Sequence, residues 1–285
     1  MRMRTQIIAG LACALMLGSC GKGKSDGAAQ AASDSDSAVV ETTVEKTIDT
    51  VIVDRINDIY EDKKHDVYLE LVVDFPVNGP QPLIDSIRAY LDDCLGSTYK
   101  GDLANGKAFM KHYHDAIIKQ ADECKADASE QMGHEAADMR FSQTFKATKS
   151  FEGGKVVTYS FFNDYYCGGM YGAMNYSCCC SFYKPDGQML TVKNLFANPD
   201  SPQLRTLIGK RYKAECEKIG IDIEDAFEGV SFDEFPFPNK SPYVQKDNIV
   251  FSYGLYDMNG AIVDVTIKAA DLAKYMTGKA KAIFD

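Results

Sequence analysis

Three consecutive cysteines, Cys178, Cys179 and Cys180, are the densest group of reactive side chains in the sequence. Thiolates are good zinc ligands, but successive residues of a strand point to opposite faces, so only Cys178 and Cys180 would share one. We therefore do not expect this run to hold a metal ion. Buried free thiols fit the pattern better, as does one disulfide across a hairpin from Cys167 to Cys178.

A second disulfide is suggested by Cys94 and Cys124, which fall toward the facing ends of two predicted helices. Closing a loop of about thirty residues would stabilise the fold by roughly 3–4 kcal/mol. Of the nine cysteines, Cys13 and Cys20 lie in or next to a predicted export signal, which leaves seven for the folded part. Because seven is odd, at least one thiol stays free or pairs with another chain.

The histidines show no arrangement typical of catalysis. His112 and His114 lie two residues apart on a predicted helix, so they point about 200° apart and cannot share a metal ion. A nucleophilic pair such as Cys167 with His134 would need an open site and a depressed thiol pKa, which nothing in the nearby sequence indicates. We predict no catalytic residue, no metal site and no cofactor.

Aromatic residues gather around a glycine-rich turn near residue 170. Tyrosines at a turn can stack on sugars or anchor a protein partner. Aromatic residues that alternate along paired strands also fill cores, and that interpretation stays open here. The residues that we predict to contact a ligand are Tyr165, Tyr166, Met170 and Tyr171.

The elements that would position these residues follow from hydrophobic periodicity and turn signals. Predicted helices span 83–95, 107–127 and a segment opened by Ser201-Pro202, with a short terminal helix at 271–276. Predicted strands span 47–59, 67–75, 139–147, 156–166, 175–183, 248–253 and 261–267. Runs of strands and helices without regular alternation predict an α+β fold of antiparallel sheets with packed helices, in two subdomains.

The N-terminus has the order of an export signal: Arg2 and Arg4, an apolar run at 7–17, and small residues directly before Cys20. The run is too short to span a membrane as a mature helix. It resembles a bacterial lipoprotein signal, in which Cys20 is lipidated and becomes the first residue. We expect a signal peptide at 1–19, a flexible tether at 20–46, an N-terminal α+β subdomain at 47–150 and a C-terminal domain at 151–285.

These features predict a protein anchored through its lipid in the cell envelope, outside the cytoplasm, on the periplasmic or outer-membrane face. The formal net charge is −10. Nucleic-acid binding is not expected, because it needs a clustered basic surface. A cationic partner would be favoured by long-range attraction.

The order of motifs resembles the RsiV-like extracytoplasmic domain family, preceded by the domain that usually accompanies it. The residues that carry the resemblance are 165–172, Y-Y-C-G-G-M-Y-G, then 186–196 with its D-G-Q and N-L-F, and 249–257, I-V-F-S-Y-G-L-Y-D. This chain departs from the family pattern at Tyr171, where the family has histidine, and at Cys167, where threonine is usual.

The resemblance implies binding more than catalysis, because such domains form the outer part of anti-sigma factors that sense lysozyme, and similar domains accompany a peptidoglycan deacetylase. We therefore predict a non-catalytic binding module for a protein such as lysozyme or for peptidoglycan. The alternatives are an enzyme that acts on the cell wall or other glycans, and a structural envelope component.

Overall fold

The computed structural model describes residues 50–132, 140–167, 173–221, 230–254, 257–258 and 262–285. The predicted signal, the lipidation site Cys20 and the whole of the tether lie outside these residues, as do Met170, Tyr171 and His134. In the described part of the chain, no helix is long and apolar enough to cross a membrane.

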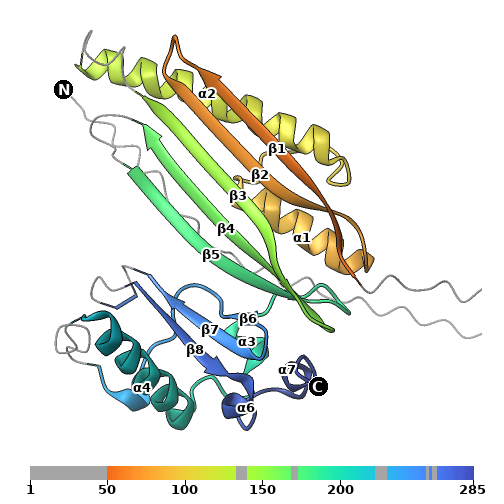
Figure 1. Cartoon of the computed structure of the whole chain (residues 1–285), viewed down its shortest axis with the longest axis vertical. Helices are drawn as coiled ribbons and strands as arrows, with labels where there is room; N and C mark the ends of the chain where they lie inside the picture. Colours follow the sequence, from red (N-terminus) through yellow and green to blue (C-terminus); the bar gives the residue numbers. More distant parts are fainter. Residues whose placement is uncertain (1–49, 133–139, 168–172, 222–229, 255–256, 259–261) are drawn as a thin grey trace, which may run out of the picture. The chain divides into compact units, whose positions relative to one another are not determined.

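A five-stranded sheet forms the larger part of the fold (Figure 1). Its strands, in spatial order, are β1 (Ile52–Asp62), β2 (Val67–Asn78), β3 (Phe141–Glu152), β4 (Val156–Cys167) and β5 (Ala173–Tyr183). All neighbours pair antiparallel except β2 and β3, which are parallel. A parallel pair needs a long crossover, and helices α1 (Gln81–Cys94) and α2 (Gly106–Met132) supply it.

Helices α1 and α2 cover one face of this sheet, which we call the helix face (Figure 1). Alternate strand residues supply its apolar side, because side chains of a strand alternate between faces. The buried residues that join the sheet to the helices are Leu69, Leu71, Val73, Phe141, Phe145, Phe161, Leu83, Ile87, Leu91, Phe109 and Tyr113. Both helices lie within a few residues of the ranges predicted from hydrophobic periodicity, 83–95 and 107–127.

A smaller sheet contains β6 (Tyr243–Gln245), β7 (Asn248–Tyr253) and β8 (Val263–Lys268). Helix α4 (Pro202–Ile219) packs with this sheet in a second apolar core. The predicted cap is present, since the Leu204 N–H donates to Ser201 Oγ at 3.4 Å. Short helical segments complete this part: α3 (Val192–Leu195), η3 (Phe232–Glu234), α6 (Ala269–Leu272) and α7 (Gly278–Lys281). The single terminal helix predicted at 271–276 is thus replaced by α6 and α7.

The α+β fold class is confirmed, but the predicted boundary at residue 150 falls inside β3. Strand β4 pairs with β3 over almost its whole length, and β5 pairs with β4. The large sheet consequently continues to Tyr183. Gly153 and Gly154, which closely follow the predicted boundary, lie in the connection between β3 and β4, two paired strands of one sheet.

Candidate binding face of the large sheet

The two predicted ligand residues that the structure describes, Tyr165 and Tyr166, point to opposite faces of β4. Tyr165 lies on the helix face, where its ring meets Phe141 edge-on with centroids 5.5 Å apart. Burial raises the pKa of Tyr165, and a hydrogen bond with Gln120 of α2 opposes this rise. Tyr166 lies on the other face and is partly exposed. Tyr165 is partly exposed as well, but its ring packs against the helix-face core, so Tyr166 is the better placed of the two to contact a ligand.

The strand register places a second tyrosine beside Tyr166. Ser142 of β3 pairs with Tyr68 of β2 on one side and with Tyr166 of β4 on the other. Residues that pair directly across strands share a face, so the three side chains form one row. Two strand spacings separate the tyrosines, which is about 10 Å.

Two further rows continue this surface. Thr144 lies between Glu70 and Asp164, and Lys146 lies between Val72 and Phe162. Lys146 Nζ forms an ion pair with Glu70 Oε1 at 2.9 Å. We call these three rows the open face; its residues, all partly exposed, are Tyr68, Glu70, Val72, Ser142, Thr144, Lys146, Phe162, Asp164 and Tyr166.

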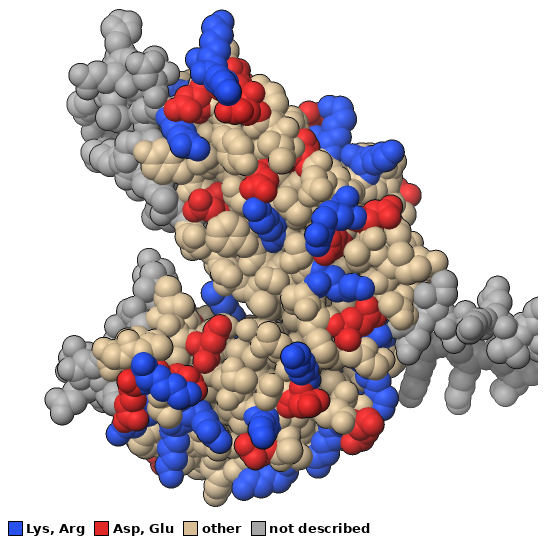
Figure 2. Space-filling view, in the orientation of Figure 1, with Lys and Arg blue, Asp and Glu red and all other residues tan. Residues whose placement is uncertain are grey.

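The open face combines aromatic rings with hydroxyl and carboxylate groups. Such a surface can stack on a ligand and can also donate and accept hydrogen bonds. In the view of Figure 2, acidic and basic side chains are interspersed among uncharged residues. The open face itself follows this pattern, because Glu70 and Asp164 stand beside Lys146.

The same side of the sheet is covered at its other end. Thr158 Oγ1 lies 2.7 Å from Ser181 Oγ and donates to the Val244 carbonyl of β6 at 2.8 Å. The Val244 N–H in turn donates to Ser181 Oγ at 2.8 Å. Thr158 and Ser181 are both buried. This contact with the small sheet limits the open face to the rows nearer Tyr166.

Sequence reasoning missed Tyr68 and Phe162 as members of this surface. Phe162 belongs to the aromatic cluster around the predicted turn, and its even position along β4 assigns it to the face of Tyr166. Local sequence could not show that Tyr68 belongs to this surface, because Tyr68 lies beside Ser142 only through the parallel pairing of β2 with β3.

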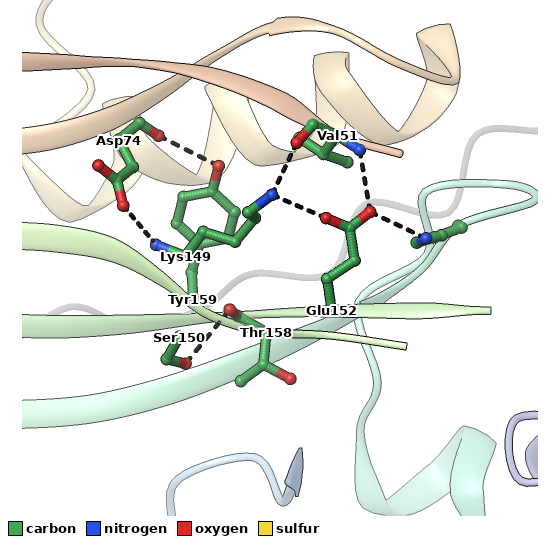
Figure 3. Close-up of polar contacts among 8 residues, drawn as sticks. Val51, Asp74, Lys149, Ser150, Glu152, Thr158 and Tyr159 are labelled. Carbon is green, nitrogen blue, oxygen red and sulfur yellow. Dashed lines mark hydrogen bonds and ion pairs between the residues drawn. The ribbon is translucent and has the colours of Figure 1, made fainter. Parts of the chain in front are cut away.

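A polar network fixes the start of β1 to the β3–β4 hairpin (Figure 3). Glu152 accepts a hydrogen bond from the Val51 N–H at 2.9 Å and pairs with Lys149 Nζ at 2.7 Å. Lys184 Nζ, whose side chain is 5% exposed, lies 2.9 Å from the same carboxylate. Burial opposes ionisation of Glu152, but the hydrogen bonds from Lys149 and Lys184 outweigh it, and its pKa falls below the ordinary value.

We expect Glu152→Gln to lower the free energy of unfolding by about 2 kcal/mol at pH 7, because it removes the ion pairs of Glu152 with Lys149 and with the buried Lys184. A carboxyl whose pKa is lowered by folding stabilises the native state above its unfolded pKa of 4.5. That contribution to stability is lost as the pH falls from 4.5 through the lower pKa that Glu152 has in the folded state. Urea unfolding of both proteins between pH 7 and pH 3 checks this, and the gap should narrow only below pH 4.5.

The matched control is Glu61→Gln, because Glu61 is exposed and its oxygen is 4.0 Å from Lys63 Nζ. A surface pair of this kind contributes about 0–1 kcal/mol, so the control should unfold like the unmodified protein. Equal losses for the two substitutions would contradict the assigned role of Glu152.

The structure joins Cys124 of α2 to Cys167 of β4, with Cα atoms 6.7 Å apart. Both pairings suggested by the sequence are therefore wrong, and Cys94 and Cys178 are free. Cys178 of β5 lies opposite Phe161 of β4, and Phe161 is six residues before Cys167 on the same strand. Cys178 and Cys167 are therefore about 20 Å apart along the sheet, too far for a disulfide. Cys94 is the last residue of α1, and this end of α1 meets α2 at Tyr113, whose hydroxyl donates to the Asp92 carbonyl. Cys124 lies about three helical turns farther along α2, beyond the reach of Cys94.

The described histidines make single polar contacts. His65 Nδ1 lies 2.6 Å from Asp62, His114 Nδ1 lies 2.9 Å from Asp58, and His112 Nε2 lies 2.9 Å from Thr98 Oγ1. Among the described residues, no group of three or more histidine, cysteine or acidic side chains is arranged to hold a metal ion.

Comparison with known proteins identifies the fold. The sequence matches no protein-family model and is not significantly similar to any curated protein. A DUF3298 family protein from Bacteroides fragilis superposes with a TM-score of 0.62 at 15% identity, over 82% of this chain and 96% of that chain. A DUF3298 family protein from Pseudomonas aeruginosa superposes with a TM-score of 0.52 at 11% identity, over 81% of this chain and 97% of that chain. The chain thus shares its fold with proteins of the DUF3298 family, which is defined by a domain of unknown function.

Proposed function

We propose that the chain is a lipid-anchored, non-catalytic binding module of the cell envelope and that its ligand lies on the open face. The observation that carries this proposal is the row formed by Tyr68, Ser142 and Tyr166. Two partly exposed tyrosines flank a hydroxyl on the sheet face opposite α1 and α2. Side chains on paired strands are held in fixed relative positions, which lowers the entropy lost on binding.

The proposed location rests on the N-terminal motif. Arg2, Arg4, the apolar run at 7–17 and the small residues before Cys20 support export and lipidation, so the membrane would be contacted through the lipid. The Cys124–Cys167 disulfide agrees with an oxidising compartment outside the cytoplasm. The resemblance to RsiV-like domains supports the same location.

The chemistry of the open face favours a glycan ligand such as peptidoglycan. Tyrosine rings can stack on the apolar faces of sugar rings. Ser142 and Thr144 can exchange hydrogen bonds with sugar hydroxyls, and Asp164 can accept them. The spacing of about 10 Å between the tyrosines allows each ring to contact a different sugar of one chain.

The second candidate ligand is a cationic protein such as lysozyme. The net charge of −10 would attract it at long range. The family resemblance also points to lysozyme. Tyrosines are frequent anchors in protein interfaces, so the same surface would serve.

The test is the affinity of the full chain for muropeptides and, separately, for c-type lysozyme. We expect Tyr166→Ala and Tyr68→Ala each to weaken binding of the ligand by about ten-fold, the loss of roughly 1.4 kcal/mol typical of one aromatic anchor. The control is Tyr275→Ala, since Tyr275 is also partly exposed but belongs to the second core. Unchanged affinity in both open-face variants, for whichever ligand binds, would refute the proposal.

A further inference from the structure

Three thiols surround one phenol hydroxyl on the helix face, away from the open face. Cys180 Sγ lies 2.7 Å from Tyr90 Oη of α1. Cys178 shares the face of Cys180 on β5 and is also hydrogen-bonded to Tyr90. Cys94, one helical turn after Tyr90, makes the third such contact. The cluster is therefore built by two elements that the fold holds together.

Aromatic rings fix the hydroxyl at the centre of this cluster. Phe161 packs edge-on against the Tyr90 ring with centroids 4.8 Å apart, and Phe182 does so at 5.7 Å. Both phenylalanines are almost fully buried. A side chain held in this way offers its hydroxyl to the sulfurs without free rotation of the ring.

The thiols of the cluster differ in acidity. The pKa of Cys178 is lowered to about 6, mainly by a hydrogen bond with Cys180. Burial opposes this change. Hydrogen bonds with Tyr176 and Tyr90 and the positive charge of Lys240 lower the pKa further. Burial raises the pKa of Cys94 to about 12. The hydrogen bond to Cys178 likewise raises the pKa of Cys180. Negative charge in the cluster therefore settles on Cys178.

An exposed tyrosine contacts Cys178. Cys178 itself is 6% exposed, but its hydrogen-bond partner Tyr176 is 52% exposed. Lys240 Nζ lies 4.9 Å from the centre of the Tyr176 ring and pairs with the Ser177 carbonyl. Cys178 is thus in contact with an exposed side chain and is not enclosed by buried residues alone.

We propose that Cys178 and Cys94 form a peroxide-reactive thiol pair, with Cys178 as the attacking sulfur and Cys94 as the resolving sulfur. The Cys178 thiolate attacks a hydroperoxide, the O–O bond breaks, and the alkoxide or hydroxide leaves and takes up a proton. Cys178 is oxidised to a sulfenic acid, and the hydroperoxide is reduced to an alcohol or water. The Cys94 thiol then attacks Cys178, the S–O bond breaks, and a disulfide and one water molecule form. An external thiol would reduce this disulfide again.

Cys94 is the better resolving residue because of the geometry of a strand. Cys178 and Cys180 are two residues apart on β5 and point the same way, so their Cβ atoms stay about 6.7 Å apart, well beyond the roughly 3.5–4.5 Å that a disulfide needs. Cys94 approaches the same hydroxyl from the helix layer. In this structure Cys180 donates its one thiol hydrogen to Tyr90 Oη, and the same hydrogen would serve the Cys178 thiolate once it forms.

The first test is alkylation of the reduced full chain with iodoacetamide at pH 7, followed residue by residue by mass spectrometry. We expect Cys178 to react at least about ten-fold faster than two matched free thiols. Cys179 lies on the opposite face of the same strand, and Cys216 lies in the second core; burial raises the pKa of both. Slower labelling of Cys178 than of both controls in the folded protein would overturn the proposal.

The second test treats the reduced chain, freed of reductant, with hydrogen peroxide. We expect a peptide pair joined through Cys94 and Cys178. In Cys94→Ser, the sulfenic acid of Cys178 should persist and react with dimedone, whereas Cys179→Ser should form the same disulfide as the unmodified chain. A Cys178 that stays reduced, or that yields no dimedone adduct in Cys94→Ser, would contradict the assignment.

Discussion

Replacing both Cys124 and Cys167 by serine should lower the free energy of unfolding by about 4 kcal/mol. The bond closes a loop of 43 residues, and the loss of chain entropy in the unfolded state accounts for an effect of this size. The measurement is urea unfolding under non-reducing conditions. The expected midpoint is well below that of the unmodified chain, and the slope should be steeper, because the unfolded chain exposes more surface once the bond no longer constrains it.

Two comparisons isolate the disulfide from the loss of the thiols. A strong reductant should bring the unmodified chain close to the double variant and leave the double variant unchanged. Cys179→Ser, which removes a free and partly exposed thiol, should cost less than about 1 kcal/mol. A double variant within 1 kcal/mol of the unmodified chain would show that this bond does not stabilise the fold.

The disulfide also bears on the binding face, because Cys167 directly follows Tyr166 on β4. It ties the end of that strand to α2, so the tyrosine stands on a fixed backbone. We therefore expect the double variant to weaken binding even where it remains folded.

Gly187→Ala should lower the free energy of unfolding by about 3 kcal/mol, the second largest effect that we expect. Gly187 has φ of +71°, which costs a residue with a side chain about 1 kcal/mol. In addition, an added Cβ would lie 2.2 Å from the Pro82 carbonyl oxygen at the start of α1. Backbone cannot move aside as a side chain can, so overpacking adds about 2 kcal/mol.

Gly220 provides the control for this substitution. Its φ is +74°, almost the same as that of Gly187, but nothing lies within 4 Å of its added Cβ. Gly220→Ala should therefore show only the conformational cost of about 1 kcal/mol. Thermal unfolding of the two variants measures the difference, and equal losses would mean that the approach to Pro82 is unimportant.

Local signals predicted much of this fold. The strand at 248–253 and the capped start of α4 agree with the sequence because hydrophobic alternation and Ser201-Pro202 act within a few residues. The turn at Pro185-Asp186-Gly187 shows the same local control, since Gly187 has the positive φ that such turns need.

The features that sequence reasoning missed depend on contacts between distant residues. The parallel pairing of β2 with β3 is set by the packing of α1 and α2 as a crossover, and no local pattern encodes it. The disulfide was misassigned because Cys124 lies eleven residues beyond Tyr113, about 16 Å farther along α2 than the turn that meets the end of α1. At that distance Cys124 reaches the end of β4 and not Cys94.

The binding site was predicted in part for the same reason. The aromatic turn pointed to Tyr165 and Tyr166, and strand alternation decides which of them can meet a ligand. Tyr68 joins them only through the register of three strands, which the tertiary fold determines.

The central claim is that the ligand covers the open face, and hydroxyl-radical footprinting of the full chain tests it without any substitution. Oxidation of each aromatic residue would be measured with and without saturating muropeptide, and again with c-type lysozyme. With the ligand that binds, Tyr68, Phe162 and Tyr166 should become protected, while the partly exposed Tyr60 and Tyr275 should react as before. Protection of Tyr60 or Tyr275 with no change at Tyr68 and Tyr166 would place the ligand elsewhere and contradict the account.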